Sequence, residues 1–148
     1  MDEEQLRCFV DIVQHYFANQ GGKAAEVGSP YLADPEALPM LDVTGVIGIS
    51  GARQGCIYVT AGRELLRNLL LYVGETDLSD ANLADMAGEM ANTISGNART
   101  HFGPEFMISV PLVVQGRAQG FQMPKGVKAY VIPMRWHKFE ASLVVSLV

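Results

Sequence analysis

The residues best suited to chemistry in this sequence are a carboxylate and a carboxamide three positions apart, Glu89 and Asn92, in the stretch GEMANTISGNA. On a helix, residues three apart are neighbours on one face, so both side chains can act on the same bound group. Gly88, Ser95 and Gly96 lie beside the pair, although glycine costs a helix interior about 1 kcal/mol relative to alanine. This composition indicates a requirement other than helix stability.

Two explanations of the small residues remain open at this point. Gly88 and Gly96 remove side-chain bulk beside the pair, which would let another molecule approach the helix closely. Small residues also serve close packing of a helix on a helix or a sheet, and a solvated face alone would account for the pair. On spacing alone, the packing explanation is the stronger.

The helix that carries the pair is predicted to have two distinct faces. Ser79 is a suitable N-cap, with Asp80 in the first turn. Projection of residues 79–102 at 100° per residue predicts one face directed to the core, formed by Leu83, Met86, Ala87, Met90, Ile94 and Ala98. The opposite face gathers Asp85, Glu89, Asn92, Gly96 and Arg99.

The other predicted elements alternate between helical and extended patterns. Residues 3–19 place Leu6, Phe9, Val10, Val13 and Phe17 on one helical stripe, which ends at NQGG. A short strand and a proline-marked loop are predicted over 23–38, strands over 41–50 and 55–60, and a helix closed by Gly74. Strands are also predicted over 106–115, 127–134 and 138–147.

The order of these elements predicts an α+β fold, with helices on a mostly antiparallel sheet. No internal repeat, low-complexity segment or linker divides the chain, so residues 1–148 are expected to form a single domain.

Composition bounds the classes of function. The 148 residues are 49% hydrophobic and 18% charged, with a formal net charge of −5 and scattered basic residues. We therefore expect neither nucleic acid nor a membrane as the main partner. The opening MDEEQLRC is acidic where a signal peptide would be basic, and no apolar run has the length of a membrane span, so a cytoplasmic protein is expected.

The cysteines and histidines show no pattern of a metal or thiol site. Cys8 and Cys56 are isolated and are expected to be reduced, core-type residues rather than catalytic thiols. The three histidines are far apart in sequence and lack metal-ligand spacing. No metal or cofactor of its own is expected.

Three linked motifs resemble a known family. They are VIGISGARQGCIYVTAG, ETDLSDANLADMAGEMANTISGNARTHFG and ISVPLVVQG, in that order. Together they resemble the CheX branch of the CheC/CheX/FliY chemotaxis phosphatases, in which a glycine-containing hairpin precedes a helix pair whose second helix carries E-x-x-N. The resemblance covers residues 43–116 closely and the remainder in layout.

The resemblance implies a partner and a chemistry. Family members dephosphorylate CheY-type response regulators, whose aspartyl phosphate sits beside a Mg²⁺ that belongs to the regulator. By resemblance, Asn92 would orient the attacking water and Glu89 would bind the regulator's lysine, while Asp85, Gly88, Gly96 and Arg99 would border the docking face. A non-catalytic module that binds a regulator or a larger signalling assembly is the alternative.

CheC-type relatives carry a second E-x-x-N on their first helix, and this chain has only Asp11 and Gln14 at that spacing. Both project toward the flank of the apolar stripe, and a solvated flank is the simpler interpretation. A single site is what the CheX-like branch has.

We also expect a homodimer, which the resemblance implies. AYVIPM and ASLVVSLV are strongly β-prone, and an open edge strand invites pairing with another chain. Pro133 indicates an edge or a bend, because proline cannot donate to a central ladder. The alternative is a monomer whose last strand is internal to its own sheet.

Overall fold

The computed structural model describes residues 1–116 and 127–148. The helices are α1 (Glu3–Gly21), α2 (Arg63–Tyr72) and α3 (Asp80–Phe102), with a 3-10 turn η1 at Pro35–Ala37. The strands are β1 (Glu26–Val27), β2 (Tyr31–Ala33), β3 (Val43–Gly51), β4 (Gly55–Ala61), β5 (Phe106–Ile108), β6 (Leu112–Gln115), β7 (Ala129–Trp136) and β8 (Phe139–Leu147).

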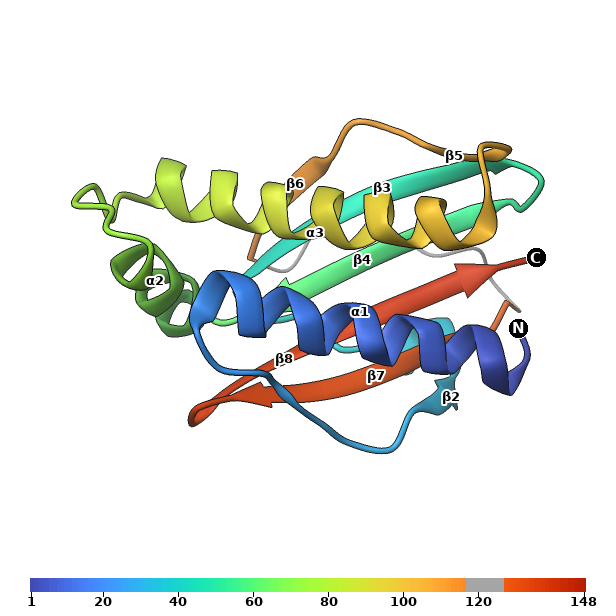
Figure 1. Ribbon diagram of the computed structural model, residues 1–148, viewed down its shortest axis with the longest axis horizontal. Helices are drawn as coiled ribbons and strands as arrows, with labels where there is room; N and C mark the ends of the chain where they lie inside the picture. The colour runs from blue at the N-terminus through green and yellow to red at the C-terminus, as the bar shows by residue number, and fades with distance from the viewer. Residues whose placement is uncertain (117–126) are drawn as a thin grey trace.

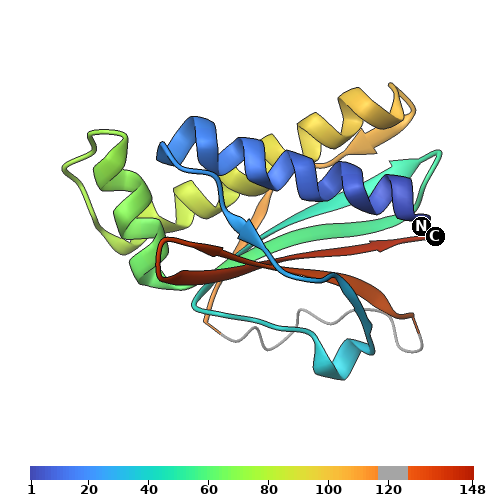
Figure 2. The same ribbon diagram turned by 60° about the horizontal axis from the view of Figure 1, so that its bottom comes forward.

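These strands form one antiparallel sheet in the order β1-β7-β8-β4-β3-β5, with β2 also pairing with β7 and β6 with β3. The helices cover one face of the sheet, while η1 and the segment around it lie over the other (Figures 1 and 2). The prediction of an α+β fold with a mostly antiparallel sheet is confirmed.

The main core lies between the helices and the sheet. Of the predicted stripe on α1, Phe9, Val13 and Phe17 are fully buried, and Leu6 and Val10 pack against them in part. A smaller cluster lies on the other face of the sheet, where Leu38, directly after η1, packs against it. It is formed by Ala33, Val46, Tyr58, Ala129, Val131 and Val144. The sheet is therefore apolar on both faces over much of its area.

The predicted segment 106–115 is divided into β5 and β6. Pro111 lacks an N–H and cannot continue the ladder. In the connection, Ser109 donates its backbone N–H to the carbonyl of Gly48 at 2.9 Å and accepts the Gly48 N–H on its hydroxyl at 2.8 Å. One backbone bond and one side-chain bond thus hold the connection against β3 at this point.

The position of the last strand corrects one step in the expectation of a dimer. β8 pairs with β7 on one side and with β4 on the other, so it is a central strand. The edges of the described sheet are formed instead by the short strands β1 and β2 and by β5 and β6.

Pro133 lies in β7, opposite the gap between β1 and β2. β1 pairs with Met134 and Arg135, and β2 pairs with residues 129–131. Between them, the Pro133 carbonyl accepts the N–H of Gly28 at 2.8 Å. In a strand, the nitrogen and the carbonyl oxygen of one residue point to the same side. The Pro133 nitrogen, which cannot donate, therefore faces the gap between β1 and β2, where no strand pairing is lost.

Candidate functional site

The long helix α3 is anchored at its start as predicted. The Ser79 hydroxyl accepts the backbone N–H of Asn82 at 3.3 Å, and Asp80 lies in the first turn. The helix runs across the sheet, and α1 lies beside it in the opposite direction (Figure 1). At one end of this helix pair the Tyr16 hydroxyl contacts the Met86 sulfur at 3.9 Å, and at the other the Phe9 and Phe102 rings are 5.8 Å apart.

The predicted inner face of α3 is confirmed in full. Its buried members are Leu83, Met86, Ala87, Met90, Ile94 and Ala98. The sheet allows this close approach because β3 has glycine at position 45, where a Cβ would stand 2.5 Å from the Ala87 carbonyl oxygen. The inner face therefore fixes the rotation of α3 about its axis.

That rotation leaves Glu89 and Asn92 exposed to solvent. They are separated by about 4.5 Å along the axis, at a rise of 1.5 Å per residue. Within residues 1–116 and 127–148, neither side chain forms a hydrogen bond or an ion pair. A carboxylate and an amide are thus presented with their bonding capacity available to a partner.

The other predicted members of this face have different surroundings. Asp85 and Arg99 are exposed, and the Arg99 guanidinium donates to the Pro104 carbonyl at 3.2 Å. A Cβ placed on Gly96 would meet no atom within 4 Å. Gly96 is therefore a low point on the open face, as clearance for a partner would require.

Gly88 does not lie on the open face, which corrects the interpretation of its position. It is buried, and a Cβ there would stand 3.0 Å from a methyl carbon of Val113 and 3.7 Å from Pro111. Its small size permits close packing of α3 against β6. For Gly88, helix–strand packing is the explanation that holds.

Tyr16 is a neighbour of the site that the sequence interpretation did not select. Burial, and then the negative charge of Glu89, raise the pKa of Tyr16 to about 12. Its hydroxyl therefore lies under the electrostatic influence of the Glu89 carboxylate. Tyr16 follows Val13 by three residues and Phe9 by seven, so the helical period of α1 already placed it on the apolar stripe.

Both cysteines have environments that disfavour a thiolate. Burial, and then the charge of Asp11, raise the pKa of Cys8, and burial raises the pKa of Cys56 to about 11. The thiolate is the nucleophilic form of cysteine. Both residues are half-buried, in environments that keep their thiols protonated.

Among the residues that the structure describes, no group of three or more His, Cys, Asp and Glu side chains could hold a metal ion. Within the same ranges, no helix is long and apolar enough to cross a membrane.

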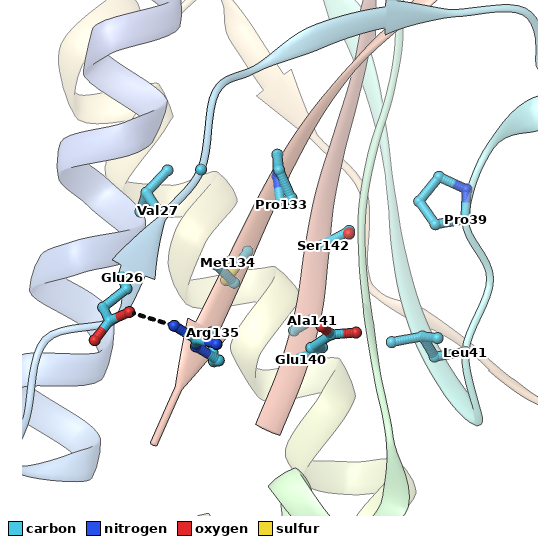
Figure 3. Close-up of a pocket in the computed structure, with 11 residues that line it drawn as sticks. Glu26, Val27, Pro39, Leu41, Pro133, Met134, Arg135, Glu140, Ala141 and Ser142 are labelled. Atoms are coloured by element: carbon cyan, nitrogen blue, oxygen red, sulfur yellow. Dashed lines mark hydrogen bonds and ion pairs between the residues drawn. The ribbon is translucent and has the colours of Figure 1, made fainter. Parts of the chain in front are cut away.

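A hollow of about 420 Å³ lies on the sheet face turned away from α3 (Figure 3). Pro133 and Ser142 contribute to its floor, and an ion pair of 2.9 Å between Arg135 and Glu26 lies at one end. Because the sheet separates it from α3, this hollow lies outside the candidate site.

Comparison with known proteins identifies the class. The family model for the chemotaxis phosphatase CheX matches residues 43–135, which include β3, β4, α2, α3 and most of β7. The chain belongs to the CheX family. No match was found among curated proteins.

Solved structures share the fold over nearly the whole chain. A protein assigned to chemotaxis from Desulfovibrio vulgaris Hildenborough is 25% identical with a TM-score of 0.84, covering 98% of this chain and 97% of its own. CheX from Vibrio vulnificus is 19% identical with a TM-score of 0.82, covering 98% and 99%. The CheX–CheY–BeF3–Mg²⁺ complex from Borrelia burgdorferi matches at 20% identity and a TM-score of 0.75, covering 97% of each chain.

Proposed function

We propose that this protein hydrolyses the aspartyl phosphate of a CheY-like response regulator. The observation that carries the proposal is the Glu89/Asn92 pair, exposed and without a side-chain partner in the described part of the chain, at the middle of a helix whose rotation is fixed by the core. In this proposal Asn92 orients the attacking water and Glu89 binds a lysine of the regulator.

The physics of phosphoryl transfer supports this division of roles. The water oxygen forms a bond to phosphorus as the bond to the aspartyl oxygen breaks, giving a free carboxylate and dihydrogen phosphate, whose two protons come from the water. The protein has little covalent work to do, so holding the water in line is the main gain available. An amide can accept from that water and donate to a phosphoryl oxygen without adding negative charge.

A carboxylate directly facing the phosphoryl group would repel it. Paired with a lysine of the partner, the Glu89 carboxylate would instead form a charge-assisted bond that fixes how the two proteins meet. The Borrelia burgdorferi CheX structure was solved with CheY, BeF3 and Mg²⁺. By analogy, the Mg²⁺ needed here belongs to the regulator's own active site.

Phosphate release tests the proposal. Each response regulator of the source organism is phosphorylated and mixed with wild-type protein or with Asn92→Ala. We expect Asn92→Ala to reduce dephosphorylation by about 10²-fold or more, the usual scale for a positioned hydrogen-bonding group. A folded Asn92→Ala protein with undiminished phosphate release would refute the role of Asn92. Binding without release by the wild type would favour the non-catalytic module instead.

We also propose a homodimer. Its interface is expected at the edge formed by β5 and β6 rather than at the last strand, β8. β8 is internal, whereas the β5 and β6 edge carries Met107, Val110 and Leu112 with exposed fractions of 54%, 84% and 60%. Apolar side chains on an open sheet edge favour pairing with a second copy. Sedimentation equilibrium decides this: a single species near the monomer mass of 16.1 kDa at micromolar concentration would refute the dimer.

A further inference from the structure

A groove of about 400 Å³ lies between α1 and α3, on the same side of the sheet as Glu89 and Asn92. α1 contributes Cys8, Asp11 and His15 to its lining, and α3 contributes Asn97, Thr100 and His101. The contacts of Tyr16 with Met86 and of Phe9 with Phe102 join the two helices near the ends of this region.

The groove is continuous with the candidate site along α3. Residues four apart follow one another along a helix face, so Asn92, Gly96 and Thr100 form one row. Thr100 folds its hydroxyl back onto the Gly96 carbonyl at 3.2 Å, and the space above Gly96 is open. From Asn92 to Asn97 the axial distance is only about 7.5 Å. Along this row Gly96 places no side chain between Asn92 and Thr100, which lines the groove.

The size of a protein–protein contact requires such an extension. A specific complex buries about 800 Å² on each partner, with roughly 20–30 residues a side. The exposed row of α3 from Asp85 to Arg99 is far smaller. The opposite flank of α3 is filled at Gly88 by Pro111 and Val113. The flank facing α1 is the open one.

The polar groups of the groove suit a partner that is rich in donors or positively charged. The Asp11 and Asn97 side chains are exposed and form no hydrogen bond or ion pair within the described ranges. The His15 ring is held by a 2.9 Å contact between its Nδ1 and the Asp11 carbonyl. Together with Glu89 and Asp85 on α3, Asp11 gives this region three exposed carboxylates. They outnumber the guanidinium of Arg99, which keeps its charge while it donates to the Pro104 carbonyl.

We propose that this groove is the second docking element for the phosphorylated regulator, with Asp11 and Asn97 as residues that determine which regulator is accepted. The proposal rests on the proposed function, because it names the same partner. The segment that enters the groove would belong to the regulator's surface beside its phosphorylated aspartate, and it would be basic or rich in hydrogen-bond donors.

The test measures the affinity and the turnover separately. Regulators of the source organism are loaded with beryllium fluoride and Mg²⁺ for titration calorimetry, and are phosphorylated for steady-state phosphate release. The variants are Asp11→Lys and Asn97→Ala, with Glu36→Lys as control, since Glu36 is an exposed carboxylate on the other side of the sheet. Circular dichroism melting confirms that each variant is folded.

We expect both groove variants to weaken binding and raise KM by about tenfold, the scale of a significant interface residue, while kcat changes less than twofold. Glu36→Lys should leave both constants unchanged. Unaltered affinity and KM in both folded groove variants would overturn the groove proposal and leave the phosphatase standing. Binding without phosphate release by the wild type would overturn the phosphatase, while the variants' affinities still decide the groove. A wild type that neither binds nor dephosphorylates any regulator would overturn both.

Discussion

The backbones of Gly45 in β3 and Ala87 in α3 lie in direct contact. A Cβ on Gly45 would stand 2.5 Å from the carbonyl oxygen of Ala87 and 3.0 Å from the Cβ of Ala91. A backbone carbonyl within a helix cannot swing aside, so any side chain at position 45 must displace the helix. Since Glu89 and Asn92 lie on the same helix, this contact sets the height of the candidate site above the sheet.

Gly45→Ala is therefore expected to lower both stability and activity. Forcing one extra carbon into a packed core typically costs about 1–3 kcal/mol. Chemical denaturation should show that loss, and phosphate release from the regulator should fall with it. Gly48→Ala is the matched control in the same strand, because its Cβ would meet only the Ser109 side chain, with the hydroxyl oxygen at 3.4 Å and the Cβ at 3.7 Å. Equal effects of the two substitutions would contradict the proposed packing constraint.

Gly96→Ala should separate stability from function. Alanine in place of a helical glycine gains about 1 kcal/mol, and at position 96 the added carbon meets nothing within 4 Å. We expect a higher free energy of unfolding together with a lower kcat/KM for the phosphorylated regulator, because the low point of the open face is filled.

Gly88→Ala is the comparison for this result. Its added carbon would stand 3.0 Å from a Val113 methyl group, so its gain in stability should be smaller than that of Gly96→Ala. Undiminished kcat/KM in Gly96→Ala would show that no partner approaches position 96.

The contrast between these glycines shows what the sequence could and could not provide. The period of 3.6 residues placed the buried and open faces of α3 correctly, because that pattern is local. The same local pattern places Gly88 on the docking face, which is wrong. Its contact with Val113 depends on the pairing of β6 with β3, and that pairing is not visible in the helix sequence. Likewise, alternation along Phe139–Leu147 predicted a strand, but only the partners β7 and β4 make it central.

The role of Glu89 can be tested through charge. Glu89→Ala should weaken productive association with the regulator, and Glu89→Lys should weaken it further by repelling the partner's lysine. Both variants should stay within about 0.5 kcal/mol of wild-type stability, as exposed positions usually do. Binding is measured with beryllium fluoride-loaded regulator at two salt concentrations, with Glu36→Lys as the charge-matched control. A large fall in melting temperature would instead assign Glu89 a structural role.

The link between Tyr16 and Glu89 predicts a change in titration. Burial and the Glu89 charge together raise the pKa of Tyr16 to about 12 from an ordinary value of 10.0. Glu89→Gln removes the charge and leaves the burial, so the pKa of Tyr16 should fall part of the way toward its ordinary value. Phenolate absorbance, taken as the difference between each protein and its Tyr16→Phe counterpart, isolates this one tyrosine. An unchanged Tyr16 titration in Glu89→Gln would place the carboxylate too far away to act on it.

The same pKa shift has a consequence for stability at high pH. The unfolded chain loses the Tyr16 proton near pH 10.0, whereas the folded protein holds it to about pH 12. Between these values the folded state binds more protons, so the free energy of unfolding falls as pH rises through this window. Burial also raises the pKa of Tyr58, which adds to the same slope. Tyr16→Phe should therefore show a shallower loss of stability between pH 10 and 12 than the wild type, measured by urea unfolding at each pH, and an identical slope would contradict the assignment.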